Sequence, residues 1–331
     1  MSTKPIAPIF MVGCPRSGTT LLRDLLRAHP RLTFPTETHF IPQLYAAYGD
    51  PGNEAEARRL AHVLMNLGWI RRWKCTFDQQ ALIACRSYAE MINEVFETWM
   101  RKEGKQRWGD KTPQNVLHIP TLAAIFPQAR FIHVNRDGRD VARSWIASPF
   151  GPENWFTAAL GWKALVQAGR CAGAALPPGM YMEVRFETLM TDLEGTLRKI
   201  CEFLGEPFDP AMLVPNVLSL RLRVHRIKAF RPYSRGLNGN AQVMTDNVGK
   251  WKKTVTLEQR TLFESVASDL LQELGYETEG LHKPIPAYSR WRWKAQSRVL
   301  ETLVKLNTQA WEYWPATVWQ MSKARLRARS K

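Results

Sequence analysis

The sequence predicts an α/β protein in which a parallel sheet is flanked by helices, because apolar runs of strand length alternate with segments of helical spacing. Three runs are typical of buried strands, at residues 9–12, 131–134 and 180–184. The first two lead through a short turn directly into a helical segment. Strands that are separated by helices pair in parallel, so we expect the three to share one sheet.

The first predicted helices follow from apolar residues spaced three and four positions apart. Four leucines within residues 21–26 mark one face of a helix that stops near Pro30. Residues 56–102 have a mostly helical pattern and could form a lid or an insertion. The second strand leads into a helix that runs past Trp145.

Two later helices begin with the pattern of a capping box. Thr191 pairs with Glu194 in the first, and Thr256 pairs with Gln259 in the second. Each start is followed by an apolar stripe at helical spacing. Between them, residues 221–253 are basic, Gly-rich and weakly patterned, which indicates a long functional loop.

The charge of the chain is high and uneven. The net charge is +16 and the sequence pI is near 9.9, which favours anionic partners. Residues 282–331 hold 11 Lys or Arg against two Glu, and five of the 13 Trp. We therefore expect a catalytic domain at residues 1–281 and a basic, Trp-rich helical extension at residues 282–331. The extension either packs on the catalytic domain with a solvated tip, or contacts an anionic membrane, an acceptor or a partner.

The cysteines and the hydropathy pattern bear on the compartment. The five cysteines are an odd number without a CxxC pair, which argues against a disulfide framework or a zinc site and fits a reducing environment. No apolar stretch reaches the roughly 18 residues of a membrane span. We expect a cytoplasmic protein whose membrane contact, if it has one, is peripheral.

The segment Gly13-Cys14-Pro15-Arg16-Ser17-Gly18-Thr19-Thr20 lies between a strand and a helix, the context of a phosphate-binding loop. Backbone N–H groups at such a helix start favour an anion. The spacing G-x-x-x-x-G matches the phosphate loop of nucleoside triphosphatases, but Thr19 stands where those enzymes have a lysine. Arg16, earlier in the turn, supplies the positive charge instead. This departure favours a donor with a shorter anionic tail; the alternative is a Gly-rich turn without a ligand.

A second anion site is predicted after the second strand. Arg136 follows the strand, and Ser144 lies eight residues on, in the next helix. A guanidinium fork and a hydroxyl can converge on one phosphate. Two such sites would suit a nucleotide with phosphates at both ends of its ribose. The alternative is that the charged residues at positions 136–140 form a surface ion-pair cluster.

Together these segments resemble the family of sulfotransferases that use 3'-phosphoadenosine-5'-phosphosulfate (PAPS). Residues 15–22 (PRSGTTLL) are similar to its 5'-phosphosulfate loop and residues 136–144 (RDGRDVARS) to its 3'-phosphate motif. Residues 182–190 and 249–256 resemble two supporting segments, and the resemblance spans about residues 6 to 278. Residues 28–42 are especially similar to the tyrosylprotein and glycan branches.

The resemblance implies a nucleotide-kinase-like fold, PAPS as co-substrate, adenosine 3',5'-bisphosphate as product, and no metal. The residues it assigns to the donor are Pro15, Arg16, Ser17, Gly18, Thr19 and Thr20 at the 5'-phosphosulfate, Arg136 and Ser144 at the 3'-phosphate, and Phe186, Lys250 and Trp251 elsewhere. Phe186 either contacts the adenine or belongs to the core. Lys250 or Lys252 beside Trp251 replaces the missing Arg-Lys-Gly of the cytosolic branch, unless this loop is only a solvated charged segment.

The catalytic groups are also implied by the resemblance. The cytosolic branch has a His base directly after Lys-Thr, where this chain has Pro113. Glu37 matches the Glu base of the tyrosylprotein and glycan branches, and it suits the role if partial burial raises its pKa. Lys111 matches the lysine near the bridging oxygen, and Arg16 adds charge beside it. The alternatives are His39 as base and a surface role for Glu37 and Lys111.

The sequence therefore predicts sulfuryl transfer to a hydroxyl or amine of an unidentified acceptor. A peptide, a glycan, a lipid-linked molecule and a small metabolite are all open as acceptors. One alternative is a P-loop phosphotransferase, which would need Mg²⁺ and the missing lysine. The other is an anion- or nucleic-acid-binding protein, which would explain the charge but not Glu37 and Lys111 in their contexts. We expect no nucleic-acid partner, and the sequence leaves the oligomeric state open.

Overall fold

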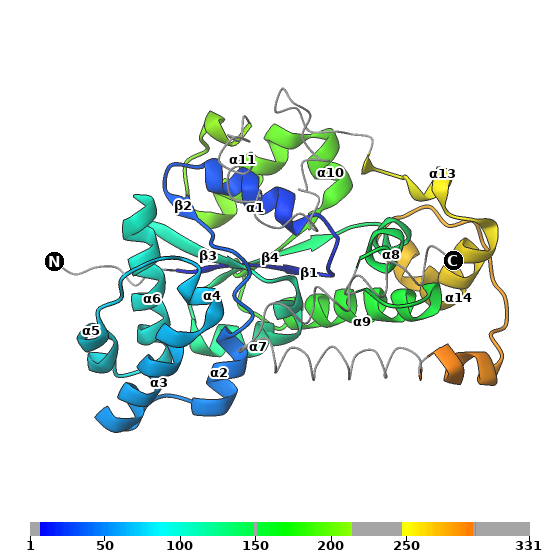
Figure 1. The fold of residues 1–331 in the computed structure, drawn as a ribbon. Coiled ribbons are helices and arrows are strands. Elements are labelled where there is room, and N and C mark those ends of the chain that lie inside the picture. Colours follow the sequence, from blue (N-terminus) through cyan, green and yellow to red (C-terminus); the bar gives the residue numbers. More distant parts are fainter. Residues whose placement is uncertain (1–6, 149–150, 214–246, 294, 296–331) are drawn as a thin grey trace. The chain divides into compact units, whose positions relative to one another are not determined.

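The computed structural model describes residues 7–148, 151–213, 247–293 and 295 (Figure 1). The chain divides into two compact units. The first, the sheet unit, takes residues 1–136 and 165–248, and the second, the helical unit, takes residues 137–164 and 249–331.

The sheet unit is built on five parallel strands in the order β2-β3-β1-β4-β5 (Figure 1). The strands are β1 (Ile9–Gly13), β2 (Leu32–Thr33), β3 (Arg107–Lys111), β4 (Arg130–Asn135) and β5 (Tyr181–Arg185). The predicted fold class, a parallel sheet flanked by helices, is confirmed.

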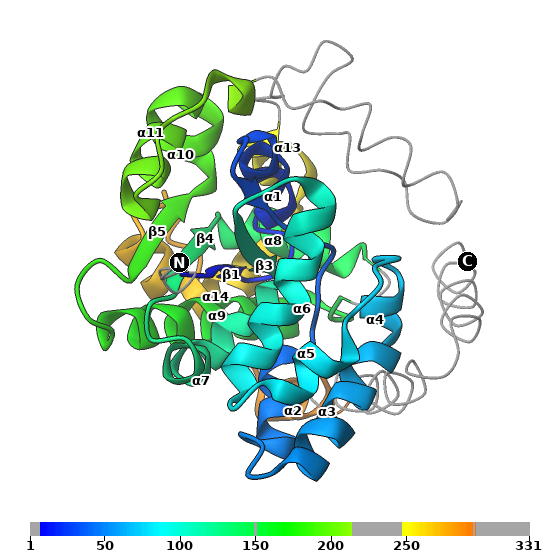
Figure 2. The same cartoon turned by 90° about the vertical axis from the view of Figure 1, so that its left-hand side faces the viewer.

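Helices cover both faces of this sheet. One face carries α1 (Thr19–Ala28), α10 (Phe186–Thr191) and α11 (Leu193–Leu204), with the 3₁₀ turn η2 (Pro210–Leu213) beside them. The other face carries α2 (Ile41–Tyr48), α3 (Glu54–Asn66), α4 (Gly68–Arg71), α5 (Gln79–Ala84), α6 (Tyr88–Glu103), η1 (Pro113–His118) and α7 (Ile119–Ile125). Figure 2 shows the same two layers from the side, with α1 on one side of β1 and α7 on the other.

The alternation of side chains along the strands builds a separate apolar core on each face. Phe10 and Val12 of β1 join the core under α2–α7, where Trp108 stacks on Phe96 with ring centroids 4.0 Å apart. Ile9 and Met11 point the other way, into the core under α1, α10 and α11. Both cores are closed by residues far apart in sequence, so β1 is held rigidly at the centre of the sheet.

Several sequence-based expectations are confirmed by these elements. The predicted strands correspond to β1, β4 and β5, and the predicted helices at residues 21–26 and 56–102 correspond to α1 and to α3–α6. The capping box at Thr191 is wrong. Asp192 caps α11 by accepting from Gly195 N at 3.0 Å, because Thr191 still belongs to α10, where its hydroxyl donates to Glu187 O.

The helical unit holds α8 (Gly138–Ile146), the first half of α9 (Trp155–Ala174), α13 (Trp251–Thr254) and α14 (Leu257–Glu273). The capping box of Thr256 with Gln259 at the start of α14 is confirmed. The loop predicted at residues 221–253 is mostly outside the described residues, but its end is wrong, since Trp251–Thr254 is helical.

The predicted extension is described only at its start. Residues 287–293 are helical, and the rest of residues 296–331 lie outside the described part. The boundary between residues 281 and 282 stays a prediction. No helix among the described residues is long and apolar enough to cross a membrane.

Candidate active site

The phosphate loop connects the end of β1 to the start of α1. Arg16 and Gly18 both have a left-handed backbone, with φ of 75° and 102°. Gly18 is the N-cap of α1, and a Cβ there would overlap the ring of Phe186. The tight turn therefore requires glycine at this position, and it presents the N-terminus of a ten-residue helix whose first turn holds no acidic side chain.

The buried hydroxyl of Ser17 indicates what this turn binds. Its side chain is 0% exposed, and its Oγ has no hydrogen-bond partner among the described residues. A buried polar group without a partner costs about 1–3 kcal/mol. An anion at the helix start would accept this hydrogen bond, so the loop fits a phosphate or sulfate group.

Arg136 and Phe186 lie directly against the phosphate loop. The Arg136 guanidinium donates to the carbonyl oxygens of Arg16 at 3.4 Å and Asn247 at 2.6 Å, and it lies 4.3 Å from the centre of the Phe186 ring. The Phe186 ring also packs on Gly18 and is 4% exposed. Arg136 and Phe186, both predicted to bind PAPS, therefore lie at the phosphate loop. A contact of Phe186 with the adenine stays a prediction.

The charged stretch at residues 136–140 is not the surface cluster considered as an alternative. Arg136, Asp137, Arg139 and Asp140 are all buried. Ser144 lies further along α8, in the helical unit, and its role at the 3'-phosphate stays a prediction.

Lys111 and Glu37 meet at the end of β3. The Lys111 ammonium, 2% exposed, donates to Thr20 Oγ1 of the phosphate loop at 3.3 Å and to Glu37 Oε1. The Glu37 side chain is 33% exposed, and both of its carboxylate oxygens have partners, Lys111 at Oε1 and His39 at Oε2. The two predicted catalytic residues are therefore in contact, and Lys111 joins the base candidate to the phosphate loop.

A buried network around Asp110 holds this arrangement in place. Asp110 Oδ1 accepts from Thr38 Oγ1 at 2.9 Å and Thr112 Oγ1 at 3.1 Å, and Oδ2 accepts from Asn115 at 2.9 Å. The backbone N–H of Thr38 donates to Thr112 Oγ1 at 3.1 Å. Because Thr38 follows Glu37 and Thr112 follows Lys111, the network holds the backbone beside both predicted catalytic residues in place relative to β3. No motif in the sequence pointed to a role for Asp110. Because side chains alternate along a strand, Asp110 lies on the opposite face of β3 from Lys111.

The charges of the pair oppose the effect of burial on Glu37. Burial by itself would raise the pKa of Glu37, but the Lys111 charge and the hydrogen bonds from His39 and Lys111 outweigh it and lower the pKa from 4.5 to about 2. Burial lowers the pKa of Lys111, and Glu37 opposes this effect. The condition set for Glu37 as a base, a pKa raised by burial, is thus not met while Lys111 contacts the carboxylate.

His39 contacts the other oxygen of the same carboxylate. Its Nε2 lies 3.0 Å from Glu37 Oε2, and its backbone is left-handed, with φ of 58°. The His39 ring lies 5.4 Å from the Trp69 ring, over which the Arg72 guanidinium sits at 4.8 Å. Trp69 and Arg72 belong to or follow the short helix α4, and no motif in the sequence pointed to them.

Trp251 and Lys250 lie in the helical unit, at the start of α13. The backbone N–H of Trp251 donates to Asp140 Oδ1 at 2.8 Å, and the Trp251 ring, 2% exposed, lies 3.5 Å from the Arg139 guanidinium. Lys250 is the N-cap of α13. The Trp251 ring therefore packs on a buried arginine, and donor contacts of both residues stay predictions.

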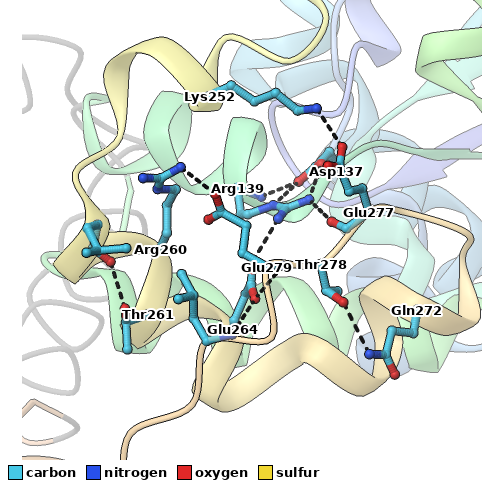
Figure 3. Close-up of polar contacts among 12 residues, drawn as sticks. Asp137, Arg139, Lys252, Arg260, Thr261, Glu264, Gln272, Glu277, Thr278 and Glu279 are labelled. Carbon is cyan, nitrogen blue, oxygen red and sulfur yellow. Dashed lines mark hydrogen bonds and ion pairs between the residues drawn. The ribbon is translucent and has the colours of Figure 1, made fainter.

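Figure 3 shows the polar network that surrounds Arg139. Its guanidinium, 0% exposed, donates to Asp137 at 2.9 Å, to Glu264 at 2.8 Å and to the carbonyl of Glu277 at 2.6 Å. Glu264 also accepts from the backbone N–H groups of Glu279 and Leu281. Among the described residues, no group of His, Cys, Asp and Glu is arranged to hold a metal ion.

Comparison with known proteins gives a consistent set of similarities. The profile of the sulfotransferase family matches residues 8–210. The nodulation protein NoeE of Sinorhizobium fredii (strain NBRC 101917 / NGR234) is 28% identical over 297 residues, covering 82% of this chain and 67% of that protein. Protein-tyrosine sulfotransferase 1 of Danio rerio is 26% identical over 304 residues, covering 87% and 76%.

The fold is shared with solved sulfotransferase structures. The sulfotransferase domain from the curacin biosynthetic pathway has a TM-score of 0.53 at 21% identity, and the match covers 83% of this chain and 100% of that domain. At this identity the similarity concerns the fold alone.

Proposed function

The chain belongs to the sulfotransferase family, and we propose that it transfers a sulfuryl group from PAPS to a hydroxyl or amine of an acceptor, with Glu37 as the general base. The observation that carries this proposal is the position of Lys111, whose ammonium contacts both the phosphate loop and Glu37. A donor group at the loop and an acceptor at Glu37 would then meet at one lysine.

In this proposal the phosphate loop binds the 5'-phosphosulfate. Its residues are Pro15, Arg16, Ser17, Gly18, Thr19 and Thr20. The buried Ser17 hydroxyl and the helix start supply hydrogen bonds, and Arg16 supplies a charge that the missing lysine of the kinases would otherwise provide. Arg136, buried behind the loop, is the candidate for the 3'-phosphate, and the motif adds Ser144.

The transfer itself needs a base and a cation. The acceptor oxygen or nitrogen attacks the sulfur while Glu37 takes its proton, and the bond from sulfur to the bridging oxygen breaks. Lys111 and Arg16 stabilise the negative charge that develops on the leaving oxygen. The Glu37 side chain is 33% exposed, which supports an acceptor approaching the carboxylate from solvent.

The proposed acceptor carries a hydroxyl or an amine, and its class is still to be identified. One relative is named a protein-tyrosine sulfotransferase and another a nodulation protein. Because the two are about equally similar to this chain, their names do not select one class of acceptor. The cytoplasmic location and a peripheral membrane contact of residues 282–331 remain predictions.

Radiolabelled transfer tests this function. PAPS carrying a labelled sulfate is incubated with a cell lysate and the wild-type chain, Glu37→Gln, or the control Glu54→Gln, whose carboxylate is 71% exposed in the same unit. We expect a labelled product with the wild type and the control, and almost none with Glu37→Gln. Equal labelling without the enzyme, or by the wild type and both variants, would contradict the proposal.

A further inference from the structure

Lys111 lies between two sites that can each hold an anion, the Glu37 carboxylate and the phosphate loop. Its ammonium is nearly buried and donates on one side to Thr20 of the phosphate loop and on the other to Glu37. An ammonium offers three N–H donors but only one positive charge. An anion bound at the loop would therefore compete with Glu37 for that charge.

His39 holds the carboxylate from the opposite side. Lys111 contacts Oε1 of Glu37, whereas His39 Nε2 contacts Oε2 at 3.0 Å. The Trp69 ring lies against the His39 ring. The left-handed backbone of His39 sets the direction in which its side chain leaves the main chain. If Lys111 turned away, His39 would still orient the carboxylate, and Oε1 would be left open toward the phosphate loop.

We propose that the donor frees the base: binding of its 5'-anion draws Lys111 away from Glu37, so that Oε1 can take the acceptor proton only when the donor is in place. The proposal rests on the function proposed above. It assigns Lys111 two positions and makes His39 the residue that positions Glu37 throughout the cycle.

The electrostatics of the pair agree with this assignment. While Lys111 contacts Glu37, burial is outweighed and the pKa of Glu37 is about 2, which makes the carboxylate a weak base. Neutralising Lys111 with a donor anion removes the largest lowering influence, and burial then acts to raise the pKa. The donor-free protein thus keeps its base inactive, and the donor complex activates it.

A double-mutant cycle in calorimetry tests the competition. Adenosine 3',5'-bisphosphate is titrated into the wild type, Glu37→Gln, Lys111→Met and the double variant. We expect Glu37→Gln to bind the bisphosphate roughly tenfold tighter than the wild type, because Lys111 is no longer shared, and we expect no such gain in the Lys111→Met background. An equal gain in both backgrounds, or none in either, would overturn the proposal.

A second ligand keeps the test valid if Lys111→Met does not fold. Adenosine 3'-monophosphate lacks the 5'-anion, so Glu37→Gln should bind it no tighter than the wild type does. A gain of the same size for both ligands would overturn the proposal. If the wild type binds neither ligand, the proposed function itself fails, which separates the two outcomes.

Discussion

Two ion pairs with a buried cation, one in each unit, differ in the exposure of their acidic partner. Arg139 and Glu264 in the helical unit are both 0% exposed, and Glu264 accepts further hydrogen bonds from two backbone N–H groups. Lys111 in the sheet unit is also buried, but its partner Glu37 is 33% exposed. We therefore interpret the fully buried pair as structural, and the buried lysine that faces a partly exposed carboxylate as a candidate for catalysis.

Removing the Glu37 carboxylate should have the largest effect on activity. We expect Glu37→Gln to lower kcat by about 10²–10⁴ because a positioned base is lost. The thermal midpoint should also fall at neutral pH, because the buried Lys111 loses its charge partner, but the protein should remain folded. Initial rates with PAPS and a melting curve on the same sample measure both. Near-normal turnover would remove Glu37 from the role of base.

The Arg139–Glu264 pair should show the opposite behaviour. Glu264→Ala leaves part of the Arg139 charge uncompensated in the interior and should destabilise the protein by about 3–5 kcal/mol. Denaturant unfolding measures the loss, with Glu258→Ala, an exposed residue on the same helix, as the matched control. A loss no greater than the control's would mean that this network is not structural.

Lys111→Ala should lower kcat by about 10²–10³, by analogy with the loss of one charge-stabilising donor. Steady-state kinetics over a range of PAPS concentrations separates kcat from KM. If only KM for PAPS increased, Lys111 would bind the donor without stabilising the transition state.

Changes at His39 should lower kcat less than changes at Glu37 or Lys111 do. The loss of the hydrogen bond between His39 and Glu37 should account for the whole effect. His39→Phe keeps an aromatic ring beside Trp69 but loses the contact to Glu37, and should lower kcat about tenfold. His39→Gln, which can donate to the same oxygen, should recover most of this loss. Equal rates for the two variants would show that the contact is not what positions Glu37.

The smallest expected effect is on stability in acid. The pKa of Glu37 is 4.5 when unperturbed and about 2 in the folded protein, so its stabilising contribution is complete above pH 4.5 and is lost as the pH falls toward 2. Wild type should therefore lose slightly more thermal stability than Glu37→Gln across this window. Melting curves at neutral pH and near pH 3 measure the difference; a larger loss in Glu37→Gln would contradict the sign.

The parts of the fold that could be predicted from the sequence are those with a local pattern. The run before the phosphate loop is continuous and apolar, and α14 repeats its apolar residues at helical spacing, so both were found. Strand β3 was missed because its five residues, RWGDK, include three charged side chains. Asp110 and Lys111 belong to the site network, and Arg107 pairs with Glu206. Strand β2 has only two residues and leaves no pattern.

The arrangement of the site depends on contacts that no local pattern encodes. Glu37 and Lys111 are 74 positions apart, and their pairing, which reverses the expected direction of the pKa shift of Glu37, follows only from the order of β2, β3 and β1. The burial of Arg139 likewise depends on α14 and on the segment after it, more than 120 residues away in sequence.

Calorimetric titration of adenosine 3',5'-bisphosphate into the wild-type chain tests the account most directly. We predict one-to-one binding, at least tenfold tighter than that of ATP with Mg²⁺, since the phosphate loop lacks the kinase lysine. Absence of binding, or tighter binding of ATP, would contradict PAPS as the donor and with it the roles assigned to Lys111 and Glu37.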